Sequence, residues 1–260
     1  MSRRTQQPAG KDSVLVRINK VLADAGVCSR RKADELILSG QVAVNEATVT
    51  ELGLRINPGT DTVRVQGKLI DLKPDEQKRF IYLMLNKPVQ VVSTVTDPQK
   101  RTTVIECLPP ALRNQRVYPV GRLDYFSEGL LLLTNDGDLT NRLTHPRYHQ
   151  PKVYDVTVRE KPDASSLRMM RDGMTLSEGQ KLAPVEVKIL SSCSNATVLQ
   201  MTLHQGVNRQ IRRMCRDLGL TVLSLKRIAL GPLSLGNLPQ GQVRHLDASE
   251  GQALKTSAGL

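Results

Sequence analysis

The hydrophobic pattern of the first seventy residues predicts two short helices followed by a small sheet. From Arg17, four apolar residues recur at helical spacing: Ile18, Val21, Leu22 and Ala25. Ser29 is suited to cap a second helix, which Gly40 would end. Short alternating segments then predict strands at residues 42–45, 47–49 and 62–65, with a turn at 57–59.

From Phe80 the pattern becomes richer in strands. Strands are predicted at residues 81–85, 117–120, 130–134, 153–158, 185–190, 198–203 and 221–225. Helices are predicted at residues 138–143, 164–171 and 208–218. Strands outnumber helices and the two are irregularly interspersed, which favours an α+β domain with a mixed, largely antiparallel sheet flanked by helices.

Composition divides the chain into five segments. Residues 1–13 are polar and basic and are expected to be a disordered tail. A small domain at 14–72 and a polar linker at 73–79 precede a large domain at 80–250. Residues 251–260 are expected to form a flexible tail.

The stretch from Gly121 to Gly137 is the most informative part of the chain. Arg122 and Asp124 follow an apolar segment, and the run of four leucines at 130–133 begins soon afterwards. A loop between two core elements is therefore predicted. Burying a carboxylate is costly unless it is paired. Spacing alone favours a local salt bridge or a turn-capping Asp over a functional acid.

Charge indicates the class of partner. Lys and Arg outnumber Asp and Glu by 37 to 25, giving a net charge of +12. A basic protein of this kind is expected to bind a polyanion, most often nucleic acid, with an anionic membrane surface as the competing partner. No apolar run approaches the roughly 18–20 residues needed to span a bilayer, and no signal peptide is recognisable.

Cofactor motifs are missing from the sequence. The four cysteines lie far apart without a C-x-x-C pair, so neither a disulfide framework nor a metal site is expected. Reduced thiols indicate a cytoplasmic protein. No glycine-rich nucleotide-binding motif occurs, so an enzyme of this sequence would act through its side chains alone.

Two groups of cations are candidate phosphate contacts. The first lies on the two N-terminal helices: Arg17, Lys20, Arg30, Arg31 and Lys32. The second forms a stripe on the helix at 208–218: Arg209, Arg212, Arg213 and Arg216. Each group is equally compatible with a solvated basic face. The scarcity of acids between Met201 and Gly231, where Asp217 stands alone, favours phosphate contact for the stripe.

Residues 14–72 resemble the αL RNA-binding domain named after ribosomal small-subunit protein S-four. The resemblance rests on the run from Arg17 to Asp34 and on Gly40-x-Val42-x-Val44-Asn45. It implies that this domain anchors structured RNA.

Residues 14–247 as a whole resemble the RsuA, RluB, RluE and RluF family of RNA pseudouridine synthases. The matching motifs are Asn86-Lys87-Pro88 with Ser93-Thr94, Gly121-Arg122-Leu123-Asp124-x-x-Ser127-x-Gly129-Leu130, Lys152-x-Tyr154, and Asn208-Arg209-Gln210-Ile211-Arg212-Arg213-Met214. Such enzymes detach uracil from its ribose, rotate it and rejoin it through carbon 5, without a cofactor. The resemblance makes Asp124 the catalytic aspartate, acting either as a nucleophile or as a base.

The resemblance also implies roles for three other residues. Arg212 matches the cation that pairs with the aspartate. Tyr154 matches an active-site tyrosine that can stack on the base, although a lone strand tyrosine is more often a core or edge aromatic. Arg122 matches the residue that holds the target nucleotide out of its helix.

Three departures from the family pattern stand out. Gln90 replaces a usual glycine, Phe126 stands where a small or polar residue is common, and Gln205-Gly206-Val207 replaces Glu-Gly-Arg. The last is closer to the RluF subgroup. The expected substrate is large-subunit (23S) ribosomal RNA, with small-subunit (16S) ribosomal RNA and tRNA as alternatives. A monomer is expected, and a non-catalytic RNA-binding assembly factor is the competing function.

Overall fold

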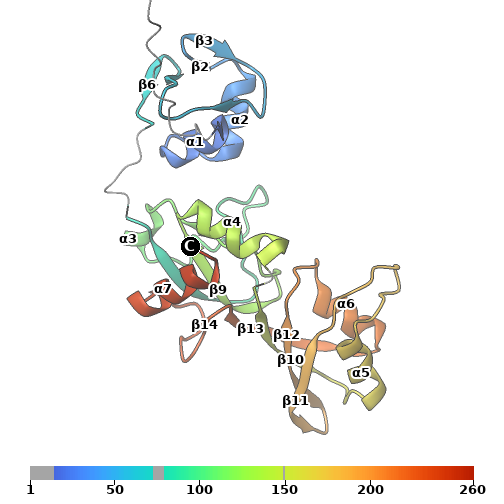
Figure 1. Ribbon diagram of the computed structural model, residues 1–260. Helices are drawn as coiled ribbons and strands as arrows, with labels where there is room; N and C mark the ends of the chain where they lie inside the picture. The colour runs from blue at the N-terminus through green and yellow to red at the C-terminus, as the bar shows by residue number, and fades with distance from the viewer. Residues whose placement is uncertain (1–14, 73–78, 149) are drawn as a thin grey trace, which may run out of the picture. The chain divides into compact units, whose positions relative to one another are not determined.

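The computed structural model describes residues 15–72, 79–148 and 150–260, and divides into two compact units, residues 1–79 and 80–260 (Figure 1). The expected tail at 1–13 and all of the expected linker except Arg79 lie outside the described residues. Among the described residues, no helix is both long enough and apolar enough to cross a membrane.

The first unit has the two helices and the small sheet that the sequence predicts. The helices are α1 (Ile18–Asp24) and α2 (Arg30–Leu38), and Ser29 Oγ caps α2 by accepting a hydrogen bond of 3.2 Å from Lys32 N. A sheet of order β3-β2-β5-β6 and a separate β1–β4 pair complete the unit. Their bounds are β1 (Val16–Arg17), β2 (Val42–Val44), β3 (Ala47–Val49), β4 (Arg55–Ile56), β5 (Val63–Val65) and β6 (Lys68–Ile70).

The second unit is built on a nine-stranded mixed sheet, which confirms the predicted α+β class. The main order is β11-β12-β10-β13-β9-β7-β15, with β14 paired to β13 and β8 to β9. The β9–β13 pair is parallel, and the other described pairs of this sheet are antiparallel. The strands are β7 (Tyr82–Lys87), β8 (Tyr118–Pro119), β9 (Glu128–Thr134), β10 (Lys152–Val158), β11 (Glu186–Cys193), β12 (Ala196–Leu203), β13 (Val222–Leu230), β14 (Leu233–Ser234) and β15 (Val243–His245).

The helices of this unit pack on the sheet and are short. They are α3 (Pro110–Arg113), α4 (Gly137–Thr144), the 3-10 helix η1 (Pro146–Tyr148), α5 (Ala164–Asp172), α6 (Gln210–Asp217) and α7 (Ala248–Ser257). The three predicted helices correspond to α4, α5 and α6 within two residues at each end.

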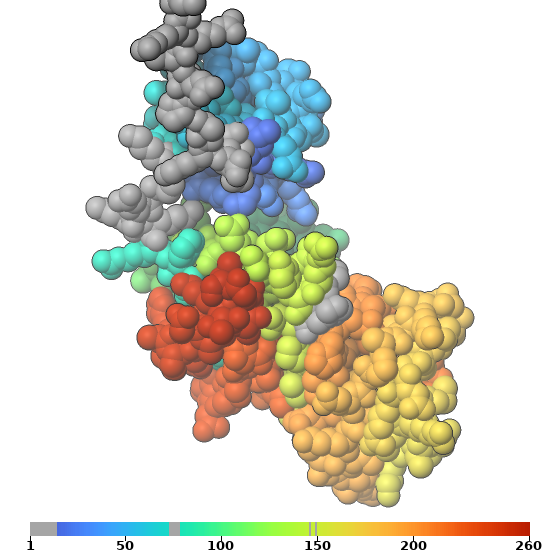
Figure 2. All heavy atoms as spheres, viewed as in Figure 1, coloured from blue at the N-terminus to red at the C-terminus, as the bar shows by residue number. Residues whose placement is uncertain are grey.

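The expectation of a flexible tail at residues 251–260 is wrong, because this segment forms most of α7. Asp247 and Glu250 make a reciprocal capping box at the start of the helix. Leu254 and Ala258 are buried in a cluster that includes Leu139 and Leu143 of α4. Figure 2 shows the C-terminal helix, in red, packed on the green part of the chain. The Asp-x-x-Glu spacing at residues 247–250 is the sequence signal for this helix.

The four leucines of β9 are all fully buried because the sheet is covered on both faces there. Leu130 and Leu132 pack in the cluster with α4 and α7. Leu131 and Leu133 pack in the opposite cluster, which also contains Leu123. The loop that carries Asp124 is therefore anchored to this second face.

Candidate functional site

Asp124 lies half-buried in the loop between β8 and β9. The residue before it is held by Ser93, whose buried hydroxyl donates to Leu123 O at 2.9 Å and accepts from Leu123 N at 3.1 Å. The backbone N–H and C=O groups of Leu123 are thus both hydrogen-bonded by the Ser93 side chain. The position of the Asp124 backbone is fixed from this side.

Lys87, at the end of β7, forms hydrogen bonds with backbone carbonyl groups of the same loop. Its side chain is fully buried, and Nζ donates to Pro88 O at 2.8 Å, Ser127 O at 2.8 Å and Asp124 O at 3.3 Å. Burial lowers the pKa of Lys87 to about 8, while nearby acidic groups, Asp124 among them, act in the opposite direction. The sequence motif contained Lys87, but only its position in a buried strand could have signalled this role.

We expect the reaction that the resemblance implies, pseudouridine formation, to slow above about pH 8, where Lys87 loses its proton. The neutral amine has two N–H donors for three carbonyl groups, so the loop loses one of its ties. Lys87→Met should abolish this pH dependence and lower the rate roughly 10- to 100-fold, because it misplaces the loop. Single-turnover rates between pH 6.5 and 9.5 measure both effects.

A fall in stability would not explain the same pH profile. The pKa of Lys87 is lower in the folded protein than its ordinary value of 10.5, so above about pH 8 the unfolded chain binds more protons. Titration of this group therefore increases the free energy of unfolding as the pH rises through that window. A wild-type rate that stays constant to pH 9.5 would contradict the assigned role.

Gln90 adopts the backbone conformation that the usual glycine of the family would favour. Its φ is +61°, and its N–H donates to Tyr125 O at 2.7 Å. A non-glycine residue pays about 1–2 kcal/mol in this region. Gln90 therefore adopts a positive φ in spite of its side chain, and its N–H adds a third hydrogen-bonding contact to the Asp124 loop.

Arg212 approaches the loop from α6. Its Nη2 donates to Phe126 O at 2.7 Å and contacts Ser127 Oγ at 3.4 Å. Within the described residues no ion pair joins Arg212 to the Asp124 carboxylate. Burial lowers the pKa of Arg212 and the Asp124 charge opposes this effect, so the two groups lie within electrostatic range. The Nε atom of Arg212 is buried without a partner in the described chain.

Tyr154 lies on β10, on the same side of the sheet as the loop. It packs against the cluster that contains Leu123 and also against the cluster that contains Ile211 and Met214 of α6. In the strand register Tyr154 pairs with Arg227 of β13. Tyr154 is thus a half-buried residue where two core clusters meet.

Gly129 allows β9 to approach β13 closely. Its φ is +102°, and a Cβ atom there would lie 2.3 Å from Arg227 O and 2.7 Å from Arg227 N. Arg227 is itself buried, and its Nε donates to Leu130 O at 2.8 Å. Since Tyr154 and Gly129 flank Arg227 on adjacent strands, they lie roughly 10 Å apart across the sheet.

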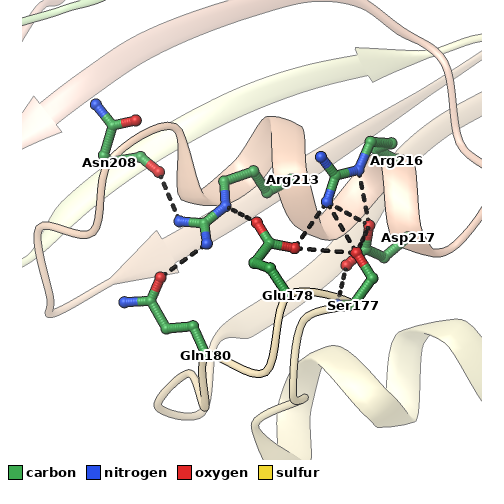
Figure 3. A network of polar contacts seen from close by, with 7 residues as sticks. All are labelled: Ser177, Glu178, Gln180, Asn208, Arg213, Arg216 and Asp217. Carbon is green, nitrogen blue, oxygen red and sulfur yellow. Dashed lines mark hydrogen bonds and ion pairs between the residues drawn. The ribbon is translucent and has the colours of Figure 1, made fainter.

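The basic stripe on α6 is not free of acids, contrary to the sequence-based argument. Arg213 Nε pairs with Glu178 at 2.6 Å, and its other nitrogens donate to Gln180 Oε1 at 2.8 Å and Asn208 O at 3.1 Å (Figure 3). Arg216 is paired with Glu178 and with Asp217. These contacts attach α6 to the loop after α5, so the geometry favours a structural role for Arg213.

Arg209 differs from these neighbours on the helix. It is exposed, has a φ of +49°, and its side chain makes no hydrogen bond or ion pair with the part of the chain that the structure describes. Together with Arg212, Arg216 and residues 219–222 it lines a hollow of about 510 Å³. The hollow presents cations beside α6.

Comparison with protein families decides the identity. A model described as RNA pseudouridylate synthase matches residues 81–217, and an S4 domain model matches residues 16–61. The chain belongs to the RNA pseudouridylate synthase family. Its matched region spans the Asp124 loop, Tyr154 and α6.

Relatives of this synthase extend over nearly its whole length. An uncharacterised RNA pseudouridine synthase of Aquifex aeolicus is 43% identical, over 94% of this chain and 96% of that protein. Ribosomal large subunit pseudouridine synthase B of Bacillus subtilis is 41% identical, over 93% and 96%. The dual-specificity synthase RluF of Escherichia coli is 38% identical, over 90% and 77%. The similarity is therefore not particular to the RluF subgroup.

A solved structure has the same fold. A crystal structure described as pseudouridylate synthase matches 92% of this synthase and 99% of its own chain, with a TM-score of 0.66 and 27% identity. The fold and family predicted from the sequence are confirmed.

The remaining residues predicted to contact RNA differ in whether their side chains already form ion pairs within the protein. In the first unit Lys20 pairs with Asp24 at 2.7 Å, and Lys32 pairs with Glu35 at 2.9 Å. The other three cations of the first unit are Arg17, Arg30 and Arg31. They are exposed and have no side-chain partner among the described residues, and the same holds for Arg122 in the second unit. These arginines are available to a ligand without loss of an internal contact.

Proposed function

We propose that this synthase isomerises a specific uridine of large-subunit ribosomal RNA, with Asp124 as the catalytic residue. The observation that carries the proposal is the immobilised loop: Ser93, Lys87 and Gln90 tie its backbone at 2.7–3.3 Å while the Asp124 carboxylate is left unbonded within the described chain. A preorganised reactive group is what catalysis by side chains requires. The Bacillus subtilis relative named for the large subunit supports the RNA class.

Arg212 is proposed to stabilise the negative charge of the Asp124 carboxylate. A half-buried carboxylate is destabilised by lost hydration, and a guanidinium within electrostatic range offsets this loss because it remains charged. Its unpaired buried Nε supplies a further donor for a substrate or for the carboxylate. Both roles of Asp124, nucleophile and base, are compatible with this arrangement.

Tyr154 and Arg122 are proposed to handle the nucleotide. Tyr154 is placed where its ring can stack on a uracil that has left its helix. Arg122 is exposed two residues before Asp124 and can hold the RNA strand from which the base was taken. Extruding a base costs a few kcal/mol, which such contacts must offset.

The S4 domain is proposed to anchor the RNA through Arg17, Arg30 and Arg31. Arg30 and Arg31 lie in the first turn of α2, where free N–H groups also favour phosphate. Lys20 and Lys32 contribute charge but hold intrahelical ion pairs. We further propose a monomer in the cytoplasm, consistent with four free cysteines.

Arg209, which precedes α6, and Arg213, within α6, should behave differently when replaced by alanine. Arg209→Ala should raise the Kd for RNA about 3- to 10-fold and reduce the salt dependence by about one phosphate contact, with an unchanged Tm. Arg213→Ala should instead lower the Tm by roughly 1–3 °C, because α6 loses its exposed contacts with Glu178 and Gln180, although Arg216 still pairs with Glu178. Filter binding across salt concentrations and thermal unfolding separate the two. Equal effects of the two variants on Kd and Tm would contradict this assignment.

Mapping pseudouridines tests the function directly. Ribosomal RNA and tRNA from strains with and without the gene are compared, and the deletion strain is complemented with wild type or Asp124→Asn. Loss of one large-subunit pseudouridine, restored by wild type alone, is the expected result. A lost site in small-subunit RNA or tRNA would reassign the substrate, and no lost site would favour a non-catalytic assembly factor.

A further inference from the structure

Phe126 exposes an aromatic ring two residues after Asp124. Its exposed fraction is 59%, the side chain of Val89 nearby in the loop network is 43% exposed, and the chain contains only two phenylalanines and no tryptophan. Leaving such a ring in water forgoes the free energy of burying it. An exposed aromatic beside a proposed catalytic residue indicates that a ligand covers it.

Neighbouring side chains support the ring. Tyr125 and Phe126 meet edge to face, with centroids 5.0 Å apart and planes at 81°. The Arg101 guanidinium lies 5.9 Å from the Tyr125 centroid. Arg101 is in turn held by Asp97 through two side-chain hydrogen bonds of 2.8 and 3.0 Å. These contacts form a connected platform of Asp97, Arg101, Tyr125 and Phe126.

The backbone beneath the platform is also fixed. Tyr125 O accepts from Gln90 N at 2.7 Å, and Phe126 O accepts from Arg212 Nη2 at 2.7 Å. These two bonds hold the backbone that carries the ring, and the edge-to-face contact with Tyr125 orients the ring itself. Binding to a rigid ring costs little conformational entropy, which suits a preformed recognition surface.

We propose that Phe126 stacks on an unpaired base of the substrate RNA that neighbours the target uridine. Every nucleobase has a flat π face, and stacking on an aromatic side chain suits single-stranded or extruded bases. The exposed cation Arg122 on the same loop suits an adjoining phosphate. The inference rests on the proposed function, and it makes Phe126 a specificity-determining residue, not a catalytic one.

A tryptophan probe tests this contact independently of turnover. Phe126→Trp gives a protein with a single tryptophan, in an Asp124→Asn background that stops the reaction. Phe80→Trp is the matched control, because Phe80 lies at the opposite end of the β7–β9 pair from the Asp124 loop. Phe80 precedes the Tyr82–Thr134 end, which is roughly 17 Å along the strands from the Lys87–Gly129 end. Transcribed large-subunit ribosomal RNA should quench the fluorescence at position 126 and leave that at position 80 unchanged. Equal quenching, or none at position 126 while the RNA is bound, would overturn the inference.

Kinetics give a second readout. Phe126→Ala should raise KM for the transcript about 5- to 150-fold, the range expected for one stacked base, with kcat at saturating RNA nearly unchanged. Phe126→Tyr keeps the ring and should restore the wild-type KM. If Phe126→Ala has wild-type kinetics, the stacking proposal fails while the synthase function stands. If the wild type forms no pseudouridine in any RNA, the proposed function fails first.

Discussion

Replacing Asp124 by Asn is expected to lower the rate of pseudouridine formation at least roughly 10³-fold. Asn has nearly the same shape but can act neither as a carboxylate nucleophile nor as a base. The loop ties from Lys87 and Ser93 use backbone atoms of the loop, so they should survive the substitution. Single-turnover assays on ribosomal RNA transcripts measure the loss.

RNA affinity supplies the control for this variant. The proposed RNA contacts are made by side chains other than Asp124, so the Kd of Asp124→Asn should remain within about 3-fold of wild type. Measurable turnover by Asp124→Asn, at more than a tenth of the wild-type rate, would exclude Asp124 from the chemistry. A large rise in Kd would instead show that the carboxylate organises the RNA-binding surface.

Gly129→Ala is expected to reduce the free energy of unfolding by at least about 3 kcal/mol. The new Cβ would lie 2.3 Å from Arg227 O, a backbone atom that cannot yield easily, and the φ of +102° strains any side chain. Gly179→Ala is the matched control, with a φ of +85° and nothing within 4 Å of its Cβ position. It should cost only about 1 kcal/mol. Urea unfolding compares the two variants.

The same substitution should also impair catalysis in the molecules that remain folded. The parallel pairing of β9 with β13 is recorded at only two positions, Glu128–Lys226 and Gly129–Arg227. This short pairing joins the part of the sheet that bears the Asp124 loop to the part that bears Tyr154 and α6. Separating the strands would move Asp124 away from Arg212. Wild-type activity in a folded Gly129→Ala protein would show that the exact strand separation is unimportant.

Local pattern was sufficient to predict most elements of the fold. The helices α4, α5 and α6 carry clear apolar periodicity, and Ser29 caps α2 as its residue type indicates. The short strands β1, β4, β6, β14 and β15 are not predicted, because each has two or three residues and is recognisable only from the strand with which it pairs. Helix α7 is not evident from apolar periodicity, because Leu254 is its one buried residue, and its capping box is the remaining local signal.

Contacts distant in sequence limited what could be predicted of the site. Nothing near Lys87 reveals that its ammonium group meets carbonyls 37 and 40 residues later. The pairing of Arg213 with Glu178 joins positions 35 residues apart, so counting acids within one segment gave the wrong expectation. The roles of Asp124, Arg212, Tyr154 and Arg122 came from motif resemblance, and they remain predictions for the variants above.

The ties on the Asp124 loop have a consequence for how such enzymes diversify. Ser93, Lys87 and Gln90 form hydrogen bonds with backbone groups of the loop. These bonds do not depend on which side chains occupy positions 125 and 126. Mutations there can alter what the surface recognises without disturbing the geometry of the reactive carboxylate. Substrate choice and reactivity are thereby separated within a loop of a few residues, and natural selection can change the first while preserving the second.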